Sequence, residues 1–303
     1  MFSLAGKKAL IVGIANEDSI AFGCAKAFRA QGAELAVTFP DEKSDRFVRL
    51  VAEKLAADMI LPLDVRRDEQ FGALTEAIGR RWERIDICLH AVAFCLKADL
   101  RAPVTGCSRD GFAVAMDISV YSFIRLVRET APLMSAGGAC MTVSFLGAEK
   151  VIEHYNIMGP VKAALEAATR SMAAELGPKG IRVHALSPGP LKTRAASGIG
   201  HFDELLAAAA ARAPTHHLAT VDDVGAYAAF LASTEAANIT GGIHYIDGGY
   251  HIRAITAWQS VSRNRGRRRV ARRPPGVFHH LLSRAGARPD AGRCVRGGGC
   301  FPA

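Results

Sequence analysis

The chain has 303 residues, half of them hydrophobic, which is enough for one large α/β domain or two smaller ones. Its formal net charge of +9 comes from residues 254–303, which hold eleven Arg and a single Asp, so the charge does not indicate a nucleic-acid-binding domain in the remainder. Seven scattered cysteines without CxxC or Cys/His ligand spacing argue against a disulfide framework and against a metal site, and favour reduced thiols in the cytoplasm.

Short apolar runs alternate along the chain with amphipathic segments, starting with KALIVG at residues 8–13. This first run is too short for the core of a signal peptide, so we expect a buried strand there. The predicted strands cover residues 8–13, 34–39, 59–64, 85–91, 139–144, 181–186 and 242–247. The predicted helices cover residues 20–32, 44–55, 67–81, 110–131, 155–176 and 221–233. No apolar stretch reaches the length of a transmembrane helix.

Strict alternation of apolar strands with helices predicts right-handed βαβ units and a parallel sheet with helices on both faces. The fold class is therefore α/β, a doubly wound seven-stranded Rossmann sheet within residues 1–253. Ligands of such sheets bind beyond the carboxyl ends of the strands, so the residues that follow each strand carry the functional information.

The turn after the first strand lies where a dinucleotide diphosphate would bind, although it does not spell GxGxxG. Gly13 allows a tight exit from the strand, and Ser19 stands at the start of the next helix. Backbone N–H groups at a helix start favour a phosphate oxygen. An ordinary strand–helix loop explains this turn equally well.

The ends of the next three strands indicate which dinucleotide would fit. Asp41 and Glu42 follow the second strand, where acidic residues would repel the 2′-phosphate of NADP, so NAD(H) is preferred despite Lys43. Asp64 ends the third strand and is a candidate acceptor for the adenine amino group. Small residues follow the fourth strand at 91–93 and would let a cofactor pack on the backbone.

A tyrosine and a lysine lie seven residues apart at Tyr155 and Lys162. On a helix this spacing places both side chains on one face. An ammonium close to a phenol lowers the phenol pKa, and such a tyrosine can hold or protonate an oxygen that gains negative charge. The pair is also compatible with a buried tyrosine and a surface lysine that share a face by chance.

Five stretches together resemble the bacterial enoyl-(acyl-carrier-protein) reductases, a divergent branch of the short-chain dehydrogenases/reductases. They are G-I-A-N-x-x-S-I-A from Gly13, D-V at 64–65, Tyr155-x6-Lys162, S-P-G-P-L-K-T-x-A-A-S-G-I from Ser187, and D-G-G-Y at 247–250. Ordinary members of the superfamily carry Tyr-x3-Lys, so the six-residue gap is selective. The resemblance covers about residues 1–252.

The resemblance implies that NADH delivers hydride to the β-carbon of a trans-2-enoyl thioester, carried on acyl-carrier protein or CoA, in fatty acid biosynthesis. Tyr155 would hold the enolate oxygen, and Lys162 would hold the nicotinamide ribose and support Tyr155. The implied cofactor contacts are Gly13, Ser19, Ile20, Pro40, Asp64, Val65, Val92, Lys162, Leu191, Lys192, Thr193, Arg194 and Ala195. The implied substrate contacts are Tyr155, Cys95, Ala196 and Phe202, with residues 190–210 as a mobile lid. A homo-oligomer, specifically a tetramer, is also implied, with no metal and no membrane association.

Two positions depart from the family pattern. Phe145 stands where the family usually has a second tyrosine, so the ring is kept and a hydroxyl is lost. Asp203 and Glu204 stand in the lid helix, where acids would repel an acidic carrier protein. These departures leave open a paralogous reductase that acts on a CoA thioester or on another carbonyl or enone.

Residues 254–303 are rich in Arg, Gly and Pro and lack periodicity, so we expect disorder. A catalytically silent protein that binds nucleic acid through this tail is a third hypothesis, opposed by the intact Tyr155/Lys162 pair. The histidines at 90, 154, 184, 216 and 217 have no acid/base partners and are expected to pack or lie at the surface. Asp117 and Ser119 are expected to support the site structurally.

Overall fold

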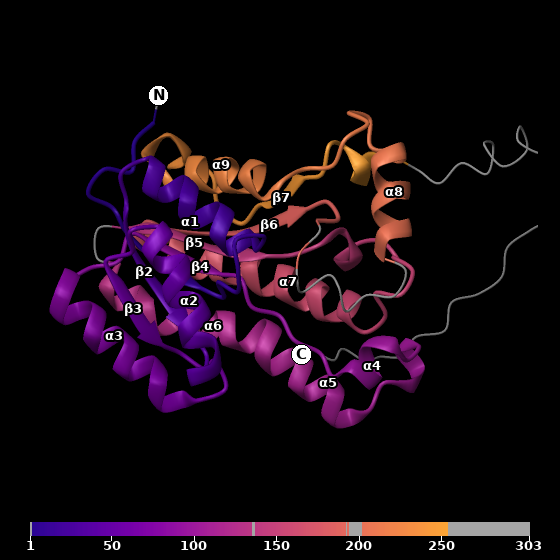
Figure 1. Ribbon diagram of the computed structural model, residues 1–303, viewed down its shortest axis with the longest axis horizontal. Helices are drawn as coiled ribbons and strands as arrows, with labels where there is room; N and C mark the ends of the chain where they lie inside the picture. The colour runs from indigo at the N-terminus through magenta and orange to yellow at the C-terminus, as the bar shows by residue number, and fades with distance from the viewer. Residues whose placement is uncertain (1, 135–136, 192, 194–201, 254–303) are drawn as a thin grey trace, which may run out of the picture. The chain divides into compact units, whose positions relative to one another are not determined.

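The structure is a computed structural model that describes residues 2–134, 137–191, 193 and 202–253. Seven strands form one parallel sheet in the order β3-β2-β1-β4-β5-β6-β7, with helices on both of its faces (Figure 1). The strands are β1 (Lys8–Val12), β2 (Glu34–Phe39), β3 (Met59–Pro62), β4 (Ile87–His90), β5 (Gly138–Val143), β6 (Ile181–Pro188) and β7 (Ile243–Ile246). The doubly wound Rossmann prediction is confirmed, and the strand order reverses between β1 and β4.

Each predicted helix has a counterpart, although the helix predicted at 155–176 starts later, at Met158; α8 holds the acids of the expected lid helix, and the short α4 was not predicted. The helices are α1 (Ile20–Ala30), α2 (Glu42–Lys54), α3 (Asp68–Trp82), α4 (Lys97–Arg101), α5 (Arg109–Met116), α6 (Ser122–Thr130), α7 (Met158–Leu176), α8 (Phe202–Arg212) and α9 (Val221–Ala232). A π-helical segment, Asp117–Tyr121, joins α5 to α6 where one long helix was predicted. None of the described helices is both long and apolar enough to cross a bilayer.

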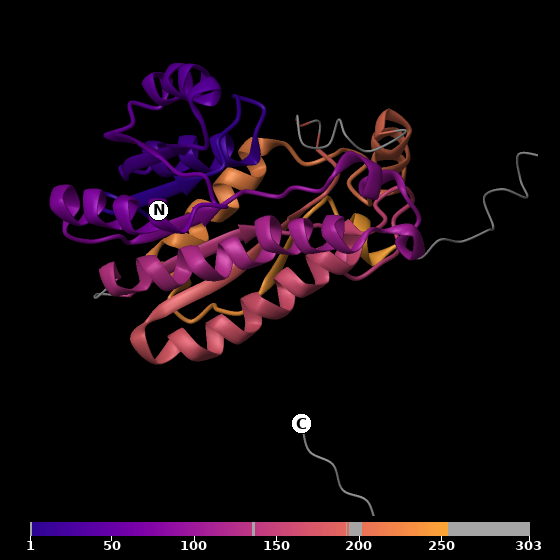
Figure 2. The same cartoon turned by 90° about the horizontal axis from the view of Figure 1, so that it is seen from below.

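Two buried cores lie on the two faces of the sheet. Helices α1, α2 and α9 cover one face, and α3, α6 and α7 cover the other. Figure 2 shows α6 and α7, in magenta and pink, running side by side on the second face. The strands bury side chains on both sides, as continuous apolar runs in a parallel sheet require.

Helices α1 and α9 touch through their backbones. A Cβ atom at Gly23 would lie 2.2 Å from the Val221 carbonyl oxygen, and a Cβ atom at Gly225 would lie 2.2 Å from the Gly23 carbonyl oxygen. Only glycine therefore fits at both positions. The contact fixes α9, which follows the lid region, against the helix that begins at the predicted diphosphate site.

Caps fix where these two helices begin. Ser19 is the N-cap of α1, and its hydroxyl accepts a hydrogen bond from the Phe22 N–H at 3.2 Å. Thr220 and Asp223 form a capping box at the start of α9. The predicted start of α1 at Ser19 is therefore confirmed.

Candidate active site

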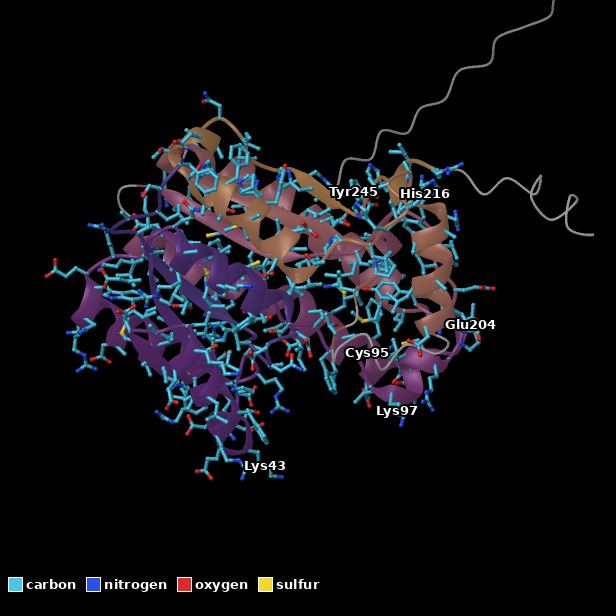
Figure 3. The ribbon with its side chains drawn as sticks, turned by 45° about the horizontal axis from the view of Figure 1, so that its top comes forward. Lys43, Cys95, Lys97, Glu204, His216 and Tyr245 are labelled. Carbon is cyan, nitrogen blue, oxygen red and sulfur yellow. The ribbon has the colours of Figure 1, made fainter. Side chains whose placement is uncertain are left out.

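The candidate site lies at the carboxyl edge of the sheet, where the loops after β1 to β6 meet. Every described residue expected to contact cofactor or substrate lies in one of these loops or in the helix that follows it. Figure 3 shows Cys95 and Lys97, after β4, on the same side of the molecule as Glu204 of α8, whereas Lys43 lies apart at the start of α2.

Tyr155 does not lie on α7, contrary to the predicted helix. It sits in a turn before Met158, and its neighbours His154 and Asn156 have φ angles of +63° and +45°. Backbone in this left-handed region interrupts a right-handed helix. The Asn156 side chain stabilises the turn by donating to the Leu100 carbonyl oxygen at 2.8 Å.

The Tyr155 ring is 8% exposed and packs edge-on against Phe145, with ring centroids 4.9 Å apart and planes at 63°. Gly147 makes room for it, because a Cβ atom there would lie 2.4 Å from the Tyr155 Cδ1 atom. The loop after β5 is therefore shaped around the tyrosine, and Phe145 keeps the aromatic contact without adding a hydroxyl.

Lys162 is buried in the second turn of α7, and its Nζ donates to the Val143 carbonyl oxygen at 2.6 Å. One turn later, Glu166 accepts a hydrogen bond from the Ser144 hydroxyl at 2.5 Å. Two charged side chains of α7 thus bind two successive residues at the end of β5. The sequence reasoning missed Glu166 and Ser144, although the four-residue step from Lys162 to Glu166 is itself a signal.

The electrostatics overturn one prediction. Burial raises the pKa of Tyr155 above its ordinary value, and the nearby Glu166 carboxylate adds to the rise. Burial lowers the pKa of Lys162 to about 8, which Glu166 partly opposes. The prediction that Lys162 lowers the Tyr155 pKa is wrong because desolvation dominates the phenol and the ammonium contacts Val143 instead. Tyr155 is a neutral phenol, able to donate a hydrogen bond.

The turn after β1 has the geometry of a dinucleotide turn. Gly13 has a φ of +106°, and a Cβ atom there would lie 2.3 Å from the Ala91 carbonyl oxygen. The backbone segments that leave β1 and β4 are therefore too close together here for any residue but glycine. The Ser19 hydroxyl donates to the Asn16 carbonyl oxygen at 2.7 Å and caps α1. Ile20 begins the helix whose N–H groups face this turn.

Carboxylates follow β2 and β3. Asp41 caps α2 by accepting from the Ser44 N–H at 2.8 Å, which lowers the pKa of the Asp41 carboxyl, and Pro40 beside it is exposed. Asp64 is buried, and its pKa is lowered first by the side chain of Arg66, which donates to both of its oxygens. The Asp64 carboxylate therefore already has a strong partner, and its contact with adenine stays a prediction.

The chemistry of this edge fits a dinucleotide without a 2′-phosphate. It combines a helix N-terminus for the diphosphate, the negative charge of Asp41 after β2 and the buried ammonium of Lys162. Arg66, in the loop after β3, is paired with Asp64 at 2.6 Å. Val65 and Val92 are half-buried in the loops after β3 and β4.

The histidines behave as predicted. His90 is fully buried between the Thr142 and Ser122 hydroxyls, at 3.2 and 2.7 Å, and burial lowers its pKa to about 3. His184 is also fully buried, next to His244, while positions 154, 216 and 217 are exposed. Ser119 bonds the backbone of Phe94 and so supports the loop that carries half-buried Cys95.

The segment after β6 is only partly described. Leu191 is buried and Thr193 is half-buried, but Lys192, Arg194, Ala195 and Ala196 lie outside the described residues, as does the side chain of Phe202. Asp203 and Glu204 are exposed at the start of α8. The predicted lid is therefore described only at its two ends.

The chain is similar to known proteins over most of its length. A family model described as enoyl-(acyl carrier protein) reductase matches residues 13–251. NADH-dependent enoyl-(acyl-carrier-protein) reductases from Aquifex aeolicus and Haemophilus influenzae are 44% and 43% identical over 253 residues. Those alignments cover 83% of this chain and 94% and 97% of the relatives.

Solved structures agree with the sequence comparisons. The Aquifex aeolicus enzyme has a TM-score of 0.80 at 43% identity, covering 83% of this chain and 99% of its own. The Anaplasma phagocytophilum reductase in complex with NAD has a TM-score of 0.81 at 40% identity, covering 85% and 98%. The Bacillus cereus reductase with NADP+ and indole naphthyridinone has a TM-score of 0.82 at 39% identity, covering 84% and 100%.

Proposed function

The chain belongs to the enoyl-(acyl-carrier-protein) reductase family, and from this premise we propose how its own residues perform the reaction. The protein is an NADH-dependent enoyl reductase of fatty acid biosynthesis, which reduces the 2,3 double bond of trans-2-enoyl thioesters. The observation that carries the assignment of residues is that the buried, neutral Tyr155 phenol and the buried Lys162 both follow β5, at the edge of the sheet where the dinucleotide turn lies.

When bound, NADH supplies a hydride to the β-carbon of the enoyl thioester. Tyr155 donates its hydrogen bond to the thioester oxygen, and this bond strengthens as negative charge accumulates on that oxygen. The Lys162 ammonium would bind the ribose hydroxyls of the cofactor and would add positive potential to the site. The α-carbon then takes a proton from solvent, so one hydride and one proton are added across the double bond.

We assign the remaining contacts by position along the sheet edge. The turn of Gly13, Ser19 and Ile20 would hold the diphosphate, because the start of α1 faces it. The adenosine and nicotinamide ends would be held by the loops after β2, β3, β4 and β6, at Pro40, Asp64, Val65, Val92, Leu191, Lys192, Thr193, Arg194 and Ala195. Cys95, Ala196 and Phe202 would line the acyl chain.

Two observations favour a second candidate substrate. Phe145 leaves the site with a single tyrosine hydroxyl, and the exposed acids Asp203 and Glu204 would repel an acidic carrier protein. A paralogous activity on a CoA thioester or on another small enone is therefore the alternative to a carrier-bound substrate.

Steady-state assays with enoyl-carrier-protein and enoyl-CoA substrates, each with NADH and with NADPH, test this proposal. We expect coupled loss of NADH and enoyl thioester, and a fall in kcat of about 10²- to 10⁴-fold in Tyr155→Phe with NADH binding retained. Tyr121→Phe is the matched control, because Tyr121 is exposed on the π-helical segment. A purified chain that neither binds NADH nor oxidises it with any enoyl substrate contradicts the proposal.

We also propose a cytoplasmic homo-oligomer, specifically a tetramer. The exposed side chain of Phe112 on α5 supports self-association. The five described cysteines are free thiols, which suits a reducing compartment. Sedimentation velocity of the full chain measures the assembly state, and a monomer at assay concentration contradicts the oligomer.

A further inference from the structure

Helix α7 is fastened to the end of β5 by two polar contacts from successive turns. Lys162 donates to the Val143 carbonyl oxygen at 2.6 Å, and Glu166 accepts from the Ser144 hydroxyl at 2.5 Å. Both charged side chains are buried, at 5% and 8% exposure. Since Phe145 follows directly, the same contacts set where the loop around Tyr155 begins.

The buried ammonium needs a counter-charge, because taking a charge out of water is costly unless an opposite charge is near. Lys162 faces the neutral imidazole of His90 from β4 and the Glu166 carboxylate from its own helix. The acid that favours the protonated lysine is therefore Glu166, which lies one turn further along α7.

The surroundings of Glu166 must be considered together. Burial, with a smaller contribution from Glu149 in the loop after β5, raises the pKa of Glu166 above its ordinary value, whereas the Ser144 hydroxyl and the cations Arg170 and Lys162 of α7 oppose the rise. Glu149 is itself paired with Lys150 at 2.6 Å and accepts from the Tyr245 hydroxyl at 2.8 Å. The Ser144 hydroxyl thus gives the buried Glu166 carboxylate a direct hydrogen-bond donor.

We propose that Glu166 is a positioning residue for the reaction: its carboxylate, fixed by Ser144, keeps the buried Lys162 protonated and directed at the site. The catalytic consequence rests on the proposed function, but the charge coupling between the two residues does not. Glu166 would act through Lys162 and not by contact with the substrate or the cofactor.

The test compares wild type with Glu166→Gln, which preserves shape and a hydrogen-bonding group but removes the charge. NADH affinity is measured by fluorescence from near pH 6 to near pH 9.5, and kcat/KM over the same range. In wild type, both NADH affinity and kcat/KM should fall at high pH as Lys162 loses its proton; we call this fall the alkaline limb of each profile. In Glu166→Gln we expect both alkaline limbs to move to lower pH by about one unit. NADH binding should then be about tenfold weaker above the limb and little changed near pH 6. Glu175→Gln, an exposed glutamate of the same helix, should leave both limbs in place.

A uniform loss across the pH range with an unmoved limb overturns the proposal, because it is the signature of a merely structural residue. If Glu166→Gln does not fold, Glu166→Asp decides: a folded protein with the wild-type limb supports the proposal, and failure of both variants to fold overturns it. Wild-type protein without enoyl reduction refutes the proposed function alone, since the NADH-binding limb still reports the coupling.

Discussion

Replacing Lys162 by methionine should remove activity and change how the stability of the fold depends on pH. The side chain is 5% exposed, and burial lowers its pKa from 10.5 to about 8. At neutral pH the lysine is nevertheless charged, so the folded state carries the cost of a desolvated ammonium that the unfolded chain does not carry. Methionine fills a similar volume without a charge.

The magnitude follows from the shift. Each pKa unit corresponds to about 1.4 kcal/mol, so the buried charge costs about 3 kcal/mol near neutral pH. Losing the hydrogen bond to the Val143 carbonyl oxygen destabilises the variant by about 1.5–3 kcal/mol, which offsets much of the gain from removing the buried charge. Because Glu166 also loses a buried counter-charge, the expected net change for Lys162→Met near pH 7 is within about 1 kcal/mol of zero in the free energy of unfolding.

The pH dependence gives the sharper result. The folded pKa lies below the unfolded one, so the cost is complete below about pH 8 and disappears as the pH rises toward 10.5. Wild type should therefore gain about 2 kcal/mol relative to Lys162→Met between about pH 7 and about pH 9.5. Activity of the variant should be lost at every pH.

Reversible urea unfolding of both proteins across this range measures the difference, with Lys97→Met as the exposed control that should show no such slope. Parallel stability curves for wild type and Lys162→Met would refute the reasoning, because they would show that the lysine is not desolvated in the folded state. A variant that is less stable by several kcal/mol near pH 7 would refute it as well.

Two further outcomes are expected. Gly147→Ala should lower kcat strongly with little loss of NADH affinity, because a Cβ atom 2.4 Å from the Tyr155 ring displaces that ring. Gly72→Ala is the control, because there is open space around Gly72. Equal kcat values for Gly147→Ala and wild type would contradict this prediction. The free energy of unfolding should fall by about 2–3 kcal/mol per pH unit below about pH 6, because His90 and His184 have folded pKa values of about 3 against an ordinary 6.5 and must charge on acid unfolding. His90→Asn should halve that slope, and an unchanged slope would show that His90 does not titrate this way.

The fold was predictable because every strand is a continuous apolar run and consecutive strands are joined by helical segments, which leaves a parallel sheet covered by helices on both faces as the arrangement that buries both sides. The region of the site was predictable for the same reason, since parallel strands end at one edge. Helix α7 was predicted to start too early, because the left-handed backbone at His154 and Asn156 leaves no mark in a residue pattern that suits a helix.

The charge state of the site was not predictable from the spacing of Tyr155 and Lys162. Spacing reports which residues are near each other, but the sign of a pKa shift depends on how much water the fold removes. Glu166 was missed for a related reason, since its partner Ser144 lies 22 residues away and joins it only when α7 packs on β5.

The backbone contact between α1 and α9 has a consequence for how this chain can vary. A Cβ atom at Gly225 would meet the backbone of Gly23, and a Cβ atom at Gly23 would meet the backbone of Val221, so neither position can be rescued by changing the side chain of a neighbour. In a library of random variants, we expect that neither glycine can be replaced alone and that the two cannot be replaced together. Their coupling is therefore invisible to covariation, and mutational scanning is the method that would reveal it.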